Sequence, residues 1–175
     1  MSEMTLGALP TTPNIVLNEA QLVQNTALGS VLVWLFVRAY NSAATRPCSL
    51  PLCFTVLPIL FHHATRKEAE STSPRSSLSK FIEKFEPNRE QLLAVNDRML
   101  AMRPLTLRSI QLACTRGLIA IAVDDATVLT VRSAALSERQ KPERLRAMLR
   151  AAEKLGIWYA PHSLSNISSS LRVFF

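Results

Sequence analysis

The segment from Arg89 to Arg132 constrains the fold of this chain more than any other. It predicts two helices separated by Pro104 and followed directly by a β-hairpin. Proline has no N–H group and disfavours helical geometry in the residue before it, so we expect the first helix to stop at Arg103. Thr106 suits the N-cap of the second helix, and Gly117 suits the left-handed residue that follows a helix end.

The hairpin is predicted from two short apolar runs on either side of an acidic turn. Leu118–Val123 and Thr127–Val131 have the composition of strands, and Asp124-Asp125-Ala126 has that of a turn. Helix, turn, helix and hairpin is the element order of a winged helix-turn-helix unit. Such units bind DNA or dock onto other proteins, and neither function is catalysis.

The upstream segments are also predicted to be mainly helical. A first helical region begins near Asn18, restarts at Asn25 and runs to about Tyr40, with apolar side chains spaced for burial on two sides. Leu50–Phe61 suits either a buried strand or a kinked helix, and helix is favoured because no neighbouring segment offers a strand partner. Thr65–Glu68 has the capping-box pattern of a further helix start.

Two more helices are expected around the central segment. Leu78–Phe85 forms a short amphipathic helix that would supply the first helix of a three-helix winged core. Ser137–Gly156 has a clear amphipathic pattern, with Pro142 in its first turn and Gly156 at its end. The tail from Ser163 to Phe175 is serine-rich but ends in apolar residues, which would have to dock on another surface.

The predicted fold class is mainly α with a small β-hairpin (α+β). It combines an N-terminal helical region, a winged helix-turn-helix-like unit and a C-terminal helix. The serine-rich run at 71–77 is the expected linker or loop. It would separate an N-terminal helical region at 1–70 from the winged-helix-like unit with its C-terminal helix at 78–160, and 161–175 would form a tail.

Composition and charge indicate a protein with partners. Of the 175 residues 48% are apolar, which is high for a soluble monomer, so part of the apolar surface is expected to be covered by another molecule. The formal net charge is +7, and the charges of residues 1–60 cancel, so the whole excess follows residue 60. A basic surface of this kind suits a phosphate backbone or an acidic protein.

Neither a targeting signal nor a membrane segment is expected. The N-terminus lacks the basic and apolar regions of a secretory signal. Ala27–Val37 would span only about 16 Å as a helix, against about 30 Å of bilayer hydrocarbon, and prolines interrupt Leu50–Phe61. The basic C-terminal helix mixes both signs of charge and lacks aromatic residues on its apolar stripe, so it does not suit a membrane surface. We therefore expect a cytoplasmic protein.

The sequence contains no recognisable catalytic or metal-binding constellation. Cys48 and Cys53 lack the second ligand pair that a zinc site needs, and with Cys114 they suit buried, reduced thiols. The adjacent His62-His63 would point in different directions on a helix. Four dispersed glycines cannot form a glycine-rich phosphate loop. We expect no enzymatic activity, no cofactor and no bound metal.

Basic side chains are the remaining functional signal. The candidate contacts with DNA or an acidic partner are Arg103, Arg108, Arg116, Arg144, Arg146 and Arg150. The second helix of a helix-turn-helix pair would present such residues to the major groove. The hairpin, however, has no Lys or Arg before Arg132, and phosphate would repel its acidic tip. Protein docking is therefore favoured over DNA contact, and a winged-helix transcription regulator is the alternative.

Several segments share their order and spacing with a known family. They are Asn25-Thr-Ala-Leu-Gly29 through Trp34 to Tyr40, Leu50 to His62, the Thr65-Arg66-Lys67 helix start, Leu78-Ser-Lys-Phe81 and Glu153-Lys-Leu-Gly-x-Trp158. Over roughly residues 18–160 the chain resembles the small middle component of bacterial three-component ABC ATPase systems, a group that includes the Lamassu anti-phage defence systems. After Tyr159 it departs from the short apolar ending expected for the family.

The resemblance implies a non-catalytic scaffold or regulatory subunit. Such a subunit would link an SMC/Rad50-like ABC ATPase to an effector, commonly a nuclease, in an anti-phage or anti-plasmid defence complex. The ATPase would sense foreign DNA or DNA ends, and the complex would release or activate the effector. The resemblance thus implies a hetero-oligomer that contacts DNA non-specifically as a complex, and it implies no catalytic residues.

Overall fold

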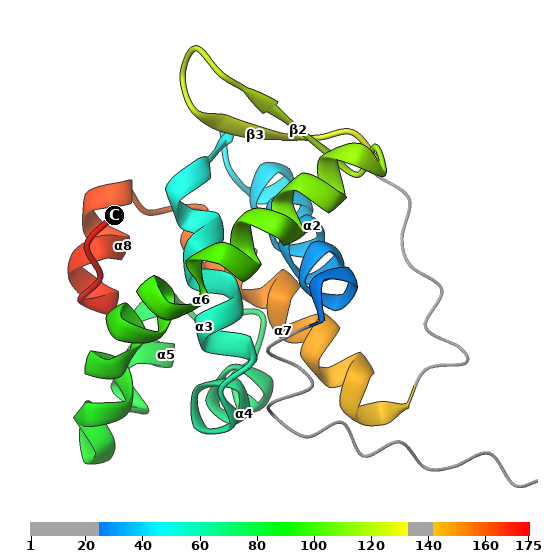
Figure 1. The fold of residues 1–175 in the computed structure, drawn as a ribbon. Helices are drawn as coiled ribbons and strands as arrows, with labels where there is room; N and C mark the ends of the chain where they lie inside the picture. Colours follow the sequence, from blue (N-terminus) through cyan, green and yellow to red (C-terminus); the bar gives the residue numbers. More distant parts are fainter. Residues whose placement is uncertain (1–24, 133–141) are drawn as a thin grey trace, which may run out of the picture.

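The computed structural model describes residues 25–132 and 142–175, which form a helical assembly with a small sheet at one end (Figure 1). The elements are α2 (Thr26–Ala43), β1 (Cys48–Ser49), the 3-10 helix η1 (Leu50–Thr55), α3 (Val56–Leu60), α4 (His63–Ser71), α5 (Leu78–Glu83), the 3-10 helix η2 (Glu86–Asn88), α6 (Arg89–Thr115), β2 (Ile119–Ala122), β3 (Thr127–Thr130), α7 (Glu143–Tyr159) and α8 (Leu164–Leu171). The predicted fold class, mainly α with a small β element, is confirmed.

Helix α2 forms the centre of this assembly. Its side chains from Leu32 to Val37 are all buried, so the helix is enclosed on every side and not only along one stripe. It contacts α7, α6 and β3. The helix starts at Asn25, where the sequence predicted a restart, and Asn25 caps it by accepting a hydrogen bond from the backbone N–H of Leu28 (2.8 Å).

The sheet is antiparallel, with the strand order β1-β3-β2. The predicted hairpin is confirmed, and Asp125 closes its turn by accepting hydrogen bonds from the backbone and hydroxyl of Thr127. Asn41 of α2 fixes the sheet to the helices. Its amide donates to the carbonyl of Val128 (3.0 Å) and its Oδ1 accepts from the N–H of Cys48 (2.8 Å), so one side chain joins α2, β3 and β1.

Helices α2 and α7 approach each other closely at Gly156. A Cβ atom at this position would lie 2.4 Å from the carbonyl oxygen of Phe36 and 2.8 Å from the backbone nitrogen of Tyr40. Only glycine fits there. The prediction that Gly156 ends the C-terminal helix is therefore wrong, since α7 continues to Tyr159 and the glycine permits backbone contact.

Helix α6 runs without interruption through Pro104, so the predicted stop at Arg103 and the helix-turn-helix are wrong. Proline removes one helical hydrogen bond, which would be made to the carbonyl of Leu100. Both residues are exposed, so water can solvate that carbonyl. Buried side chains on both sides of the proline hold the two halves in line: Leu92, Val95, Met99, Leu105, Ile110 and Ala113.

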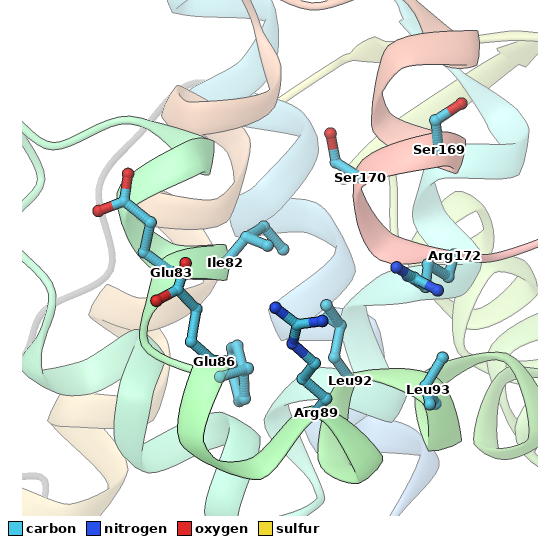
Figure 2. Close-up of a pocket in the computed structure, with 10 residues that line it drawn as sticks. Ile82, Glu83, Glu86, Arg89, Leu92, Leu93, Ser169, Ser170 and Arg172 are labelled. Atoms are coloured by element: carbon cyan, nitrogen blue, oxygen red, sulfur yellow. The ribbon is translucent and has the colours of Figure 1, made fainter.

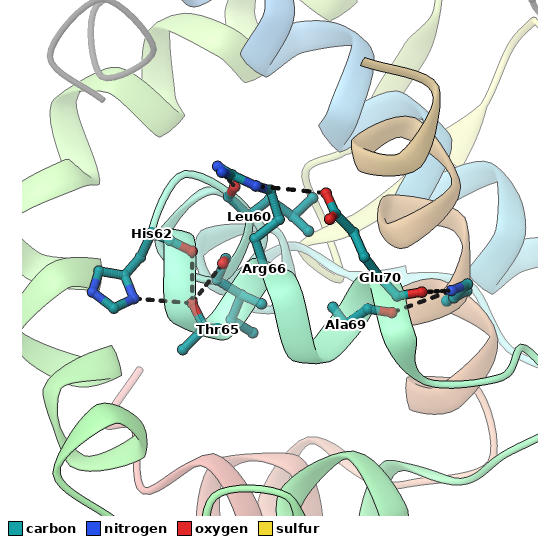
Figure 3. Close-up of polar contacts among 8 residues, drawn as sticks. Leu60, His62, Thr65, Arg66, Ala69 and Glu70 are labelled. Carbon is teal, nitrogen blue, oxygen red and sulfur yellow. Dashed lines mark hydrogen bonds and ion pairs between the residues drawn. The ribbon is translucent and has the colours of Figure 1, made fainter. Parts of the chain in front are cut away.

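The α3–α4 corner is stabilised by buried polar side chains (Figure 3). Thr65 donates a hydrogen bond to the carbonyl of Ile59 (2.6 Å), and Arg66 donates to the carbonyl of Leu60 (3.2 Å) and lies 3.5 Å from a carboxylate oxygen of Glu70. These bonds satisfy carbonyl groups at the end of α3, which has no later turn to do so. Thr65 was predicted to cap α4, but it lies inside the helix and instead joins it to α3.

Lys154 of α7 caps the other end of α4. Its ammonium donates to the carbonyls of Ala69 (3.3 Å) and Glu70 (2.7 Å), as the dashed lines to that side chain in Figure 3 show. A cation at a helix C-terminus is favoured by the helix dipole. Partial burial is the main cause that lowers the pKa of Lys154 from its ordinary value, and the charge of Arg150 adds to it.

The other sequence predictions have mixed outcomes. Leu50–Phe61 is helical as favoured, and a short helix begins at Leu78 as predicted. The predicted starts near Asn18 and at Ser137 lie outside the described residues. The domain division at 71–77 stays a prediction, although core residues from before and after that run belong to one cluster.

The two glycines at 117 and 156 offer a matched test of the packing. Gly156→Ala should lower the free energy of unfolding by more than about 2 kcal/mol, because the new methyl group overlaps backbone atoms that cannot move independently. Gly117 is left-handed (φ 63°), and a methyl group there would meet no atom within 4 Å, so Gly117→Ala should cost only about 1 kcal/mol. Urea denaturation measures both, and equal losses would contradict this account of the α2–α7 contact.

Candidate partner-binding surface

One face of α6 has large apolar side chains that contact solvent. Leu93, Leu100 and Leu107 are 49%, 55% and 50% exposed. They are spaced by seven residues, nearly two helical turns, so they form a single stripe. The sequence predicted burial of α6 on more than one side. In the described residues only the opposite side of the helix is buried, and the leucine stripe is open.

An apolar groove of about 370 Å³ lies beside this stripe. It is bounded by α6, η1, the hairpin turn and the C-terminal end, and is lined by Leu50, Pro51, Phe54, Met99, Leu100, Arg103, Leu107, Ala126, Phe174 and Phe175. Phe174 is 80% exposed, and its backbone N–H donates to Oδ1 of Asn96 (3.0 Å). The apolar tail that was expected to dock thus lies beside α6, where Arg103 is the one charged groove residue.

The hairpin provides a second apolar face. Ile119 and Val128 are buried on the side that faces the helices. Leu129 pairs with Ala120 across the strands, and these two side chains point to the opposite face. Val123 in the turn is 84% exposed, and Val131 is also exposed. Single exposed apolar residues are ordinary, but a group of them on one element indicates an interaction surface.

The predicted basic residues fall into two groups. Arg103, Arg108 and Arg116 lie exposed along α6 and at its C-cap, with no ion pair to any described carboxylate. No acidic residue occurs between Asp97 and Asp124, so all the charged side chains on this half of α6 are basic. It is suited to an acidic surface or to phosphate.

The basic residues of α7 are differently placed. Glu143 forms ion pairs with Arg146 (2.5 Å) and Arg150 (2.7 Å). The hydrogen bond from Arg150, followed by the charge of Arg146, holds the pKa of Glu143 below its ordinary value. Arg144 is exposed. Helices α6 and α7 both pack on α2, but the structure does not bring their six arginines together into one site.

A second cavity, of about 500 Å³, lies between α5, the start of α6 and the end of α8 (Figure 2). Figure 2 shows Glu83 and Glu86 on one side, Arg172 on the other and Arg89 between them. The two carboxylates and two guanidinium groups cancel in charge. Glu83 is also paired with Lys80 (2.6 Å), and nothing in this cavity selects one ligand charge over the other.

Arg172 in this cavity has an unusual backbone. Its φ is 54°, the left-handed region that glycine prefers. It ends α8 in a Schellman motif, in which its own N–H donates to Ser169 and the N–H of Val173 donates to Ser168. Helix α6 ends with the same motif, and there Gly117 holds the left-handed position as predicted.

The described residues also bear on metal binding and on the cysteines. Within 25–132 and 142–175, no three His, Cys, Asp or Glu side chains lie close enough together to hold a metal ion. The three cysteines are free, and Cys48 and Cys53 are buried. A hydrogen bond with Cys53, together with burial, holds the pKa of the Cys48 thiol well above its ordinary value, opposite to the shift that makes a nucleophile. None of the described helices has the length and apolar character needed to cross a membrane.

Sequence reasoning identified the basic residues but not the surface that adjoins them. The leucine stripe and the groove were missed because α6 is apolar on several sides, and periodicity alone does not say which side is covered. The heptad spacing of Leu93, Leu100 and Leu107 was the available signal. The apolar C-terminus was noticed, but its location against α6 required the structure.

The fold and surface define a small, mainly helical protein with exposed apolar and basic faces. A model of the family described as the ABC-three component (ABC-3C) system Middle Component 3 matches residues 14–175. The chain belongs to this family, and a component of a three-component system functions with partners. No curated protein and no solved structure matches the chain.

Replacing Arg172 tests the left-handed helix end. Arg172→Gly should raise the free energy of unfolding by about 0.5–1 kcal/mol, because glycine relieves the left-handed backbone at some cost in unfolded-chain entropy. Arg172→Ala keeps the Cβ atom and should give no such gain. Thermal or urea unfolding of both variants measures these changes. An alanine variant at least as stable as the glycine variant would refute the claim that the left-handed backbone of Arg172 is strained.

Proposed function

We propose that this chain is a non-catalytic scaffold subunit of a bacterial defence complex. It would join an SMC/Rad50-like ABC ATPase to an effector, such as a nuclease, in a cytoplasmic system of the Lamassu type. The observation that carries this proposal is membership of the middle-component family over residues 14–175. The two exposed apolar faces on α6 and the hairpin support it, since a scaffold needs surfaces that only partners cover.

The chemistry of the surface also supports docking over catalysis. The hairpin face is apolar, and the adjoining α6 face combines leucines with arginines that have no ion pair with a described carboxylate. Interfaces use apolar side chains at their centre and arginine as a frequent contact residue. A nucleophile, a base and a group that orients them would be needed for catalysis, and the described residues offer no such set.

Direct contact with DNA is a second role that one observation favours. Arg103, Arg108 and Arg116 are exposed and unpaired with described carboxylates, so they could neutralise phosphates. The alternative of a winged-helix transcription regulator loses its basis, because α6 is continuous and offers no separate recognition helix. Non-specific phosphate contact within the complex remains compatible with the surface.

The proposal is tested by co-expressing the chain with the ATPase and effector components of its own three-component system. A tag on the chain should recover the ATPase in stoichiometric amounts through size-exclusion chromatography, with no nucleotide hydrolysis by the chain alone. Failure to recover either the ATPase or the effector component would refute the scaffold function.

A hairpin substitution gives the matching prediction. Val123→Lys should leave the unfolding midpoint within about 1 °C, because the side chain is 84% exposed. It should weaken recovery of a partner by about tenfold or more, since a charge would be buried without a counter-charge. The control is Lys67→Ala, which replaces an exposed residue of α4 that is distant from the hairpin in the sequence. Unchanged recovery of both partners by the hairpin variant would remove this face from the interface.

A further inference from the structure

The leucine stripe of α6 is symmetric about its own centre. Leu93 and Leu107 each lie seven residues from Leu100, about 10 Å away along the helix in opposite directions. If a second α6 is laid antiparallel across the first, centred on Leu100, each Leu93 meets a Leu107. The stripe is therefore complementary to itself in the antiparallel orientation, as it is in the parallel one, where each leucine would meet its own copy.

One pair of charges beside the stripe, Glu90 and Arg108, has the same symmetry. Glu90 lies about 15 Å before Leu100 and Arg108 about 12 Å after it, and both lie about 80° around the helix in the same direction. In the antiparallel arrangement Glu90 of one copy lies beside the partner's Arg108, and the pair occurs twice. Neither residue has an ion pair with a described residue in the single chain.

We propose that a second copy of this chain covers the α6 stripe, forming a two-fold symmetric dimer whose axis passes near Leu100. This inference is independent of the proposed scaffold function. Apolar burial of three leucines per copy would drive association, and the two Glu90–Arg108 pairs would fix the antiparallel direction.

The C-terminal residues extend this interface. Phe174 is bound to Asn96, which lies about 6 Å before Leu100 on the flank opposite Glu90. In the dimer that flank meets the partner's Arg103 and Leu107, which line its groove. Phe174 and Phe175 line the groove of their own copy, and in the dimer they would also lie beside the groove of the other, whose described lining residues include one charged side chain, Arg103.

A cysteine on the axis gives the sharpest test. In a Cys114→Ser background, which removes the one cysteine that is not buried, Leu100→Cys should form an intermolecular disulfide under mild oxidation, because a residue on a two-fold axis meets its own copy. Val123→Cys is the matched control, since it is more exposed but lies off the axis. Equal or lesser cross-linking at position 100 would overturn the dimer.

Charge reversal supplies the second measurement. Light scattering of the unmodified chain should show a dimer at micromolar concentration. Glu90→Arg should weaken dimerisation by about tenfold, as two like-charge contacts replace two ion pairs. The double variant Glu90→Arg with Arg108→Glu should restore it. Both residues are exposed, so their substitution should not unfold the chain and thereby change dimerisation. Circular dichroism of each variant checks that it remains folded.

The outcomes separate this inference from the scaffold function. A chain that stays monomeric at about 100 µM overturns the dimer even when it recovers the ATPase. If Leu100→Glu abolishes ATPase recovery while the unmodified chain is monomeric, the stripe binds the ATPase and the dimer is again overturned. A dimer that recovers no partner would refute the scaffold function and leave the dimer standing.

Discussion

The burial of α2 is the constraint on which the rest of the structure depends. A helix with six successive buried residues cannot be stable until other elements enclose it, so α6, α7 and the sheet are required by its sequence. Two residues determine how closely α7 and the sheet approach α2. Gly156 brings the backbone of α7 against that of α2, and Asn41 holds β1 and β3 at the end of the helix.

Short-range sequence patterns predicted the fold correctly where they agreed with the need to enclose α2. The helix start at Asn25, the hairpin turn and the left-handed Gly117 depend only on neighbouring residues, and all three are confirmed. Pro104 shows the limit of such signals. A proline costs about 3 kcal/mol in a helix interior, but apolar burial on both sides of it outweighs that cost. The helix-turn-helix inference failed for this reason.

Other features depended on residues distant in sequence and could not be predicted. Strand β1 has two residues and exists only because Val128 and Thr127 lie opposite it. Thr65 matched a capping pattern but bonds to Ile59 instead. At the surface, Arg150 pairs with Glu143 of its own helix, whereas Arg108 has no ion pair with a described carboxylate, and α6 has no acidic residue after Asp97.

The two apolar faces have different consequences for a scaffold. The α6 stripe is self-complementary, whereas the hairpin face is the surface proposed above to bind a partner of the complex. A dimer through α6 would leave two hairpin faces free, one on each copy, and so create a bivalent adaptor. Two linked sites can raise overall affinity by about 10²–10⁴ without any new contact, provided both can be engaged at once. Weak binding at each hairpin would then suffice for a stable complex, because two linked hairpins would bind the partner at the same time.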